Sequence, residues 1–196
     1  MHRRLLLEQL ARYRPTRPGY QYDDSQRLHQ ILEFVEATPE CFHRHPPGHL
    51  TASAVVLDPT LSYLALTHHA KLAMWIQLGG HCDGHPDPLE VARREAAEEA
   101  GLTCLELLEP VPFDVDVLPV PARPDVPFHW HYDLRYLFTS PRVELVKTEE
   151  SKDLGWFSLE EATQLASEPT MQRLLAKVKA FRARTPMSRN NSFTTL

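Results

Sequence analysis

A glycine-rich loop that leads directly into a short acidic helix constrains this chain more than any other feature. Residues 78–87 are rich in glycine and polar residues. Asp87 then supplies an N-cap, Pro88 the first helical residue and Glu90 an acid in the first turn. Gly101 supplies the C-terminal cap. The sequence therefore predicts a helix between Asp87 and Gly101. The backbone of the preceding loop and side chains of this helix should then lie close together.

Three glutamates of this helix are candidate metal ligands. Glu95, Glu98 and Glu99 stand at i, i+3 and i+4, so they project from one side of the helix. Carboxylates at this spacing repel one another, and a divalent cation reverses that effect. Hard oxygen ligands suit Mg²⁺ or Mn²⁺, and Mg²⁺ often binds carboxylates together with phosphate oxygens. A solvated acidic helix face is the alternative that the spacing alone leaves open. A different, small and apolar side of the helix carries Leu89, Ala92, Ala96 and Ala100.

The rest of the pattern indicates strands alternating with helices. Apolar residues at helical spacing and capping signals predict helices over 4–13 and 25–36, a helix that begins at the cap Ser158, and a helix over about 170–182. Runs of apolar and alternating residues predict strands over 50–58, 61–67, 112–120, 129–138 and just before Ser158. Such an order favours a mixed sheet between layers of helices.

The strand over 129–138 has one unusually polar face, formed by His129, His131, Asp133 and Arg135. Burying these groups unpaired would cost about 1–3 kcal/mol each. Either His129, His131 and Arg135 contact a substrate, or the four groups form an internally satisfied network. His81 in the glycine loop is a further candidate for phosphate contact, although loop histidines are often simply exposed. No H-x-x-E-H or C-x-x-C spacing indicates a zinc site.

Charge and cysteine content narrow the class of protein. A formal net charge of −5 gives no general attraction to nucleic acids or anionic membranes. The three cysteines are widely spaced, as expected for reduced thiols in a cytoplasm. The N-terminus reads as a short amphipathic helix rather than a signal peptide, and no window approaches the roughly 18 apolar residues of a membrane span. We expect a soluble, cytoplasmic protein.

The segment from Gly80 to Leu102, GHCDGHPDPLEVARREAAEEAGL, resembles the Nudix box, G-x5-E-x7-R-E-U-x-E-E-x-G-U with U apolar. The matching positions are Gly80, Arg94, Glu95, Ala96, Glu98, Glu99, Gly101 and Leu102. Pro86 stands where the family has its first glutamate, and Asp83 or Asp87 is close enough in sequence to supply a carboxylate. The resemblance implies an α/β fold, an α/β/α sandwich with a mixed sheet. We assign it to residues 50–184, after an N-terminal helical extension over 1–49 and before a disordered tail over 185–196.

The resemblance also implies roles for individual residues. In the family, the E-x-x-E-E glutamates and a carbonyl of the glycine segment bind the metals, which assigns Mg²⁺ or Mn²⁺ to Glu95, Glu98, Glu99 and Gly79. Glu95 could instead orient a water molecule on the metal, and Arg94 would fix the rotamer of one carboxylate. The general base in many members lies on a later loop, where this chain has Glu149 and Glu150. A solvated acidic loop is the alternative there.

The activity implied is hydrolysis of a diphosphate linkage in a nucleoside diphosphate derivative: a dinucleotide, a sugar nucleotide such as ADP-ribose, or a nucleoside triphosphate. A catalytically weak Nudix-fold regulator that binds such ligands is the alternative, with Pro86 as its best support. The isomerase branch of the fold, which acts on isopentenyl diphosphate, is not indicated because its cysteine and glutamate pattern is not evident. The first 50 residues could form a homodimer surface or close over the site, and the sequence does not choose between them.

Overall fold

The computed structural model of the chain describes residues 2–17, 21–149 and 151–185. The predicted base Glu150 and nearly all of the predicted tail, 186–196, lie outside these described residues. The helices are α1 (Arg4–Arg12), α2 (Ser25–Ala37), α3 (Pro88–Ala100), α4 (Leu159–Leu165) and α5 (Pro169–Arg184). The strands are β1 (Gly48–Leu57), β2 (Tyr63–His69), β3 (Met74–Ile76), β4 (Leu78–His81), β5 (Glu106–Leu107), β6 (Asp114–Val120), β7 (His129–Thr139) and β8 (Ser151–Ser158).

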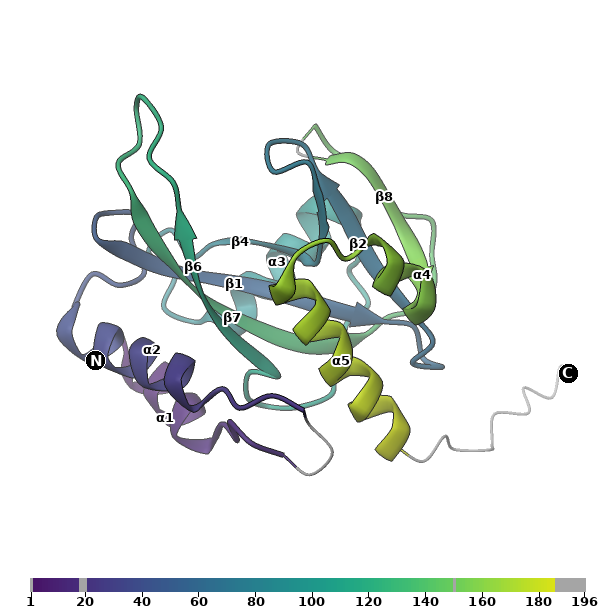
Figure 1. Cartoon of the computed structure of the whole chain (residues 1–196), viewed down its shortest axis with the longest axis horizontal. Coiled ribbons are helices and arrows are strands. Elements are labelled where there is room, and N and C mark those ends of the chain that lie inside the picture. The colour runs from purple at the N-terminus through teal and green to yellow at the C-terminus, as the bar shows by residue number, and fades with distance from the viewer. Residues whose placement is uncertain (1, 18–20, 150, 186–196) are drawn as a thin grey trace, which may run out of the picture.

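A strongly curved mixed sheet forms the centre of the molecule (Figure 1). Its main path runs β3-β2-β1-β7-β5, with β4 on β1, β6 on β7 and β8 on β2. The central pair, β1 and β7, is parallel over ten residue pairs, while the neighbouring pairs are antiparallel. The predicted α/β fold with a mixed sheet is therefore confirmed.

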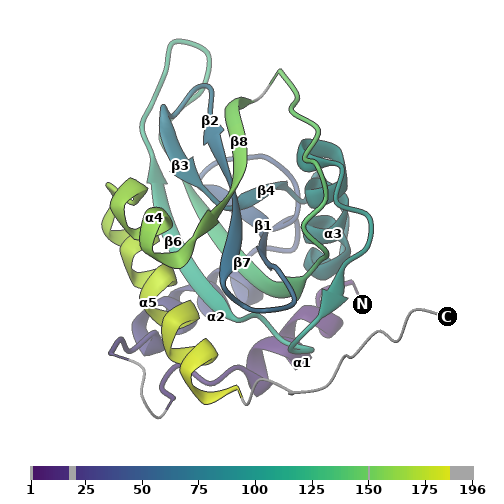
Figure 2. The same ribbon diagram turned by 90° about the vertical axis from the view of Figure 1, so that its right-hand side faces the viewer.

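The two faces of β1 contribute to two cores. Leu50 and Ala52 are buried with residues of α1, α2 and α3, whereas Val55 and Leu57 are buried with residues of α4 and α5. Successive side chains of a strand point to opposite faces, which explains this division. Figure 2 shows α3 on one side of the sheet and α4 with α5 on the other.

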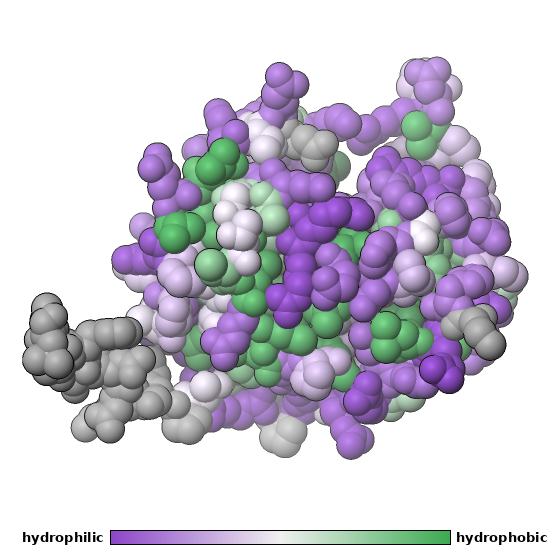
Figure 3. Space-filling model, turned by 180° about the vertical axis from the view of Figure 1, so that it is seen from behind, coloured by the Kyte–Doolittle hydropathy of each residue, from purple (hydrophilic) through white to green (hydrophobic). Residues whose placement is uncertain are grey.

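The N-terminal helices are part of the first core. Leu6 of α1 and Ile31 of α2 are fully buried, and the Phe34 ring stacks on Tyr132 of β7 with centroids 3.9 Å apart. Burial of these apolar stripes explains why both helices form. Within the described ranges, none of the helices combines the length and apolarity that crossing a membrane requires. On the face seen from behind, hydrophilic side chains lie between the hydrophobic ones (Figure 3).

Strand β4 was not predicted, because two of its residues are glycines and glycine disfavours strands. It forms through antiparallel pairing with β1, in which Gly79 faces Ser53 and Gly80 faces Ala52. The approach is so close that a Cβ on Gly79 would lie 2.5 Å from Ser53 Oγ. Pairing with a distant strand thus overrides local preference and gives the glycine segment a fixed position.

Candidate functional site

Helix α3 begins and ends as its capping residues predict. The Asp87 carboxylate accepts a hydrogen bond from the Leu89 N–H at 3.0 Å. Gly101 adopts the left-handed conformation, φ 71°, that a helix C-cap favours. The small apolar side of α3, including Ala92 and Ala96, is buried against the first core. This docking leaves the glutamate side of the helix at the edge of β4.

Two glutamates of α3, Glu95 and Glu99, lie against the two glycines in β4. The Gly79 N–H donates to Glu99 Oε2 at 2.9 Å, and Glu99 is buried. The Glu95 carboxyl group lies against Gly80, where an added Cβ would be 2.6 Å from it. Glu98 is the outermost of the three, with a side chain 63% exposed. The second glycine is therefore required for space: any side chain would displace a carboxylate.

Arg94 connects the carboxylates to the same strand. Its guanidinium donates to Glu95 Oε1 at 2.8 Å and to the His81 carbonyl oxygen at 3.2 Å. Its Nε lies 3.8 Å from Glu98 Oε2. The hydrogen bond to Glu95 is the main reason that the pKa of Arg94 is raised above its ordinary value. Arg94 thus holds Glu95 in place and interacts more weakly with Glu98.

This arrangement fits a divalent cation. Two carboxylates of one helix, Glu95 and Glu99, meet the two glycines of one strand, with Glu98 exposed beside them, and hard oxygen donors of this kind suit Mg²⁺ or Mn²⁺. The glycine that makes room for Glu95 shows that the carboxylate position is built into the local packing. Glu99 accepts from the backbone of Gly79, and Arg94 contacts both Glu95 and Glu98, while the assignment of these residues as metal ligands stays a prediction.

The two carboxylates near Pro86, those of Asp83 and Asp87, both have structural partners. Asp83 forms a two-pronged ion pair with Arg44, at 2.5 and 2.6 Å, and this contact lowers the pKa of Asp83. Asp87 is the N-cap of α3. Pro86 itself is exposed in the loop between β4 and α3. Both residues predicted to replace the first glutamate therefore have structural partners.

Arg135 lies inside the protein, so it takes the second of its two predicted roles. Arg135 is 1% exposed, and its guanidinium donates to the carboxylates of Asp133, Asp114 and Asp116. We name the surrounding group the ion cluster; it consists of Asp24, Asp114, Asp116, Asp133, Arg135, Arg173 and Lys177. The sequence identified Asp133 and Arg135 but missed the other members, because they come from distant segments. Arg173 and Lys177 lie on α5, Asp24 precedes α2, and Asp114 and Asp116 lie on β6. Arg135 is a member of an internal network rather than a ligand-facing group.

His129 and His131 lie in a different environment at the start of β7. Their Nε2 atoms are 3.2 Å apart, and the rings of His49 and His81 pack beside them. We name these four residues the histidine cluster. Burial lowers the pKa of His49 and His81 to about 4 and that of His131 to about 3. The sequence missed His49, whose position follows only from its pairing with His131 in the parallel β1–β7 ladder.

The remaining predicted site residue, Glu149, is exposed on the loop that precedes β8. The loop is held near the body of the protein by Trp156, whose indole N–H donates to the Val143 carbonyl oxygen at 3.0 Å. β8 begins at Ser151, whose hydroxyl lies 2.6 Å from that of Thr67 in β2. Glu149 thus precedes a firmly paired strand.

Comparison with known proteins identifies the family. The NUDIX domain model matches residues 47–178. The asymmetrical bis(5'-nucleosyl)-tetraphosphatase of Mus musculus is 28% identical over 130 residues, 66% of this chain and 86% of that protein. A binary complex of a C. elegans Ap4A hydrolase has a similar fold, with TM-score 0.54 and 24% identity over 68% of this chain and 97% of that one. The NUDIX domain of Shewanella oneidensis NrtR, complexed with ADP ribose, has a TM-score of 0.51 and 17% identity, over 76% of this chain and 96% of that one. The family match spans most of the chain and includes α3 with its glycine strand, so the chain belongs to the Nudix family and is a Nudix-type pyrophosphohydrolase.

Proposed function

We propose that the protein uses a divalent metal ion to hydrolyse the diphosphate linkage of a nucleoside diphosphate derivative. The observation that carries this proposal is the docking of Glu95 and Glu99 onto Gly80 and Gly79, with Glu98 exposed beside them. The name of the mouse relative makes dinucleoside polyphosphates the first substrate class to test. Sugar nucleotides, including ADP-ribose, and nucleoside triphosphates are the other classes. The three free cysteines support a cytoplasmic location for this activity.

Glu95, Glu98, Glu99 and the carbonyl oxygen of Gly79 would hold Mg²⁺ or Mn²⁺. When bound, such an ion neutralises diphosphate charge and lowers the pKa of an attacking water molecule. The protein's own part is to keep the ligands in position. Arg94 does so by holding Glu95 through its 2.8 Å contact, which fixes the rotamer of that carboxylate.

Two further groups complete the proposed site. Glu149, on the loop before β8, or its neighbour in sequence, Glu150, would take the proton from the attacking water. His81, His129 and His131 would contact the substrate through their imidazole rings. Their neighbourhood to the glycine strand supports this role, because His81 is the last residue of β4 and its carbonyl oxygen accepts from Arg94.

A substrate panel tests the proposal. Dinucleoside polyphosphates, sugar nucleotides and nucleoside triphosphates are incubated with the protein and Mg²⁺ or Mn²⁺, and the products are separated by chromatography. We expect metal-dependent turnover of at least one class and a fall in kcat on the order of 10²–10³-fold in Glu98→Gln. Glu90→Gln is the matched control, because Glu90 is an exposed glutamate of the same helix that pairs with Arg93.

Turnover by Glu98→Gln at the wild-type rate would contradict the assigned ligands. Binding of the whole panel without turnover would instead favour the alternative of a nucleotide-binding regulator. In that case Pro86→Glu, which restores the family's first glutamate, becomes the decisive variant: gain of hydrolysis would show that this departure had removed the activity.

A further inference from the structure

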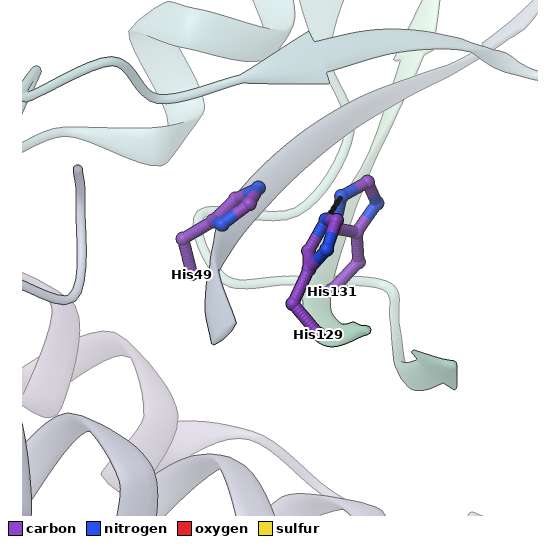
Figure 4. A group of neighbouring side chains, drawn as sticks. All are labelled: His49, His129 and His131. Atoms are coloured by element: carbon purple, nitrogen blue, oxygen red, sulfur yellow. Dashed lines mark hydrogen bonds between the residues drawn. The ribbon is translucent and has the colours of Figure 1, made fainter. Parts of the chain in front are cut away.

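Three histidines from two neighbouring strands point their ring nitrogens toward one region (Figure 4). His49 comes from β1, and His129 and His131 come from β7. We propose that these three side chains bind one divalent transition-metal ion of the Zn²⁺ class, at a site separate from the carboxylates of α3. This inference does not rest on the proposed hydrolysis.

The strand register brings the three rings together. His49 pairs directly with His131 in the parallel ladder, and His129 lies two residues earlier on the same face of β7. One ring nitrogen from each residue can be chosen so that all three lie within 4.8 Å of one another. Among the residues that the structure describes, no other group of three histidine, cysteine or acidic side chains meets this criterion.

The closest pair already has the spacing of two ligands on one ion. Nitrogens bound to a tetrahedral Zn²⁺ at roughly 2.0–2.1 Å lie about 3.3 Å apart. The Nε2 atoms of His129 and His131 are 3.2 Å apart. An ion could therefore bridge this pair without moving the rings relative to one another, and only His49 would need to approach.

The tautomer of His129 is fixed in the form that a metal requires. Its Nδ1 lies 2.9 Å from the Pro127 carbonyl oxygen. A carbonyl oxygen only accepts, so Nδ1 carries the proton, and Nε2 of the neutral ring then keeps its lone pair. Metal-binding histidines are commonly oriented in this way by a backbone carbonyl on the far nitrogen.

The ring nitrogens of His49 are buried without a hydrogen-bond partner among the described residues. The residue as a whole is 4% exposed. Leaving a buried polar group unsatisfied costs about 1–3 kcal/mol. A metal ion placed between His49 and the His129–His131 pair would satisfy one of these nitrogens.

The chemistry of the donors selects the kind of ion. Imidazole nitrogens suit Zn²⁺, Cu²⁺, Ni²⁺ and Fe²⁺, whereas Mg²⁺ prefers oxygen ligands. The α3 carboxylates and the histidine site would therefore take different metals from the same solution. His81, whose ring centroid lies 5.1 Å from that of His49 and 5.0 Å from that of His131, borders the site.

Zinc binding by the full chain tests the proposal without reference to catalysis. Metal-free protein is titrated calorimetrically with Zn²⁺ in excess Mg²⁺, which occupies oxygen sites. We expect one equivalent to bind, with affinity at least about tenfold weaker in His49→Gln and in His131→Gln. His29→Gln is the matched control, because His29 lies on α2 with a side chain 71% exposed, and it should bind as the wild type does. Glu98→Gln should also retain the site.

Cobalt provides a second measurement. Co²⁺ in a site with tetrahedral nitrogen ligands gives visible absorption bands, which should appear in the wild type and disappear in the His49 and His131 variants, each checked for folding by circular dichroism. If one variant fails to fold, the other together with the Co²⁺ spectrum of the wild type decides the question. Absence of stoichiometric Zn²⁺ uptake by the wild type would overturn the proposal, as would unchanged affinity in a folded His49 or His131 variant.

Discussion

The carboxylates of α3 and those of the ion cluster differ in what balances their charge. In the ion cluster, Arg135, Arg173 and Lys177 bind the acids directly, and every member is buried. On α3, Arg94 contacts Glu95 closely and Glu98 only at 3.8 Å, and the Glu98 side chain is largely exposed. One acidic group is neutralised by buried cations of the chain, whereas the other has its outermost carboxylate, Glu98, largely exposed to solvent. Under the proposed function, the first group supports the fold and the second binds a cation.

Removing a cation from the ion cluster should have the largest effect. Arg135→Met removes a buried cation that pairs with three aspartates, of which Asp114 and Asp116 keep Arg173, so we expect a loss of about 3–5 kcal/mol in the free energy of unfolding. Urea denaturation measures this. Arg4→Met is the control: the Arg4 side chain is 83% exposed and pairs with Glu8 across one turn, so its loss should be at most about 0.5 kcal/mol. A similar small loss in both variants would remove the distinction between the two regions.

Adding metal should affect only the α3 group. At a Mg²⁺ concentration about 100-fold above Kd, we expect about 2.7 kcal/mol of added stability, which chelation should reverse. Glu98→Gln should lose most of this gain, and Glu90→Gln should keep it. Thermal unfolding with and without Mg²⁺ checks the prediction. Equal stabilisation of the Glu98→Gln protein would mean that the ion binds elsewhere.

Acid should act on the ion cluster with a smaller and gradual effect. Nearby arginines hold the pKa of Asp116 below its usual 3.8, despite its burial. As pH falls below 3.8, the unfolded chain therefore takes up a proton first, and stability that is present above this pH is lost. Asp116→Asn should lessen this loss by at most about 1.4 kcal/mol per pH unit. Urea midpoints measured between pH 4 and 2 compare the two slopes, and parallel slopes would contradict the assignment.

Local sequence signals were sufficient for α3. Asp87, Pro88 and Gly101 define its ends, as the structure confirms, and the spacing of Glu95, Glu98 and Glu99 is the basis of the predicted metal site. These features depend on residues within one helix. The same locality explains why most helices and long strands were predicted close to their observed bounds.

Features that depend on distant pairing were not predictable in this way. His49 joins the histidine cluster only because β1 pairs in parallel with β7, which follows it by about 80 residues. Lys177 resembles a surface lysine of an amphipathic helix, yet it is buried between Asp24 and Asp114. Arg135 could be identified as unusual from its strand, but the carboxylates that surround it come from β6 and β7 together. Side-chain type alone gives no indication of such partners.

The contact between Asp24 and Lys177 also sets an order of events during synthesis. The two residues are 153 positions apart, and Arg173 on the same helix also binds Asp24. Until α5 has left the ribosome, the carboxylate of Asp24 can pair with Arg27 of α2 but lacks both cations of α5, so the ion cluster cannot close around it. The first helices to emerge therefore complete this contact only after the last one has formed. A nascent chain that stalls before α5 would leave the apolar residues of the second core, such as Leu57 of β1, uncovered for chaperones and proteases to bind.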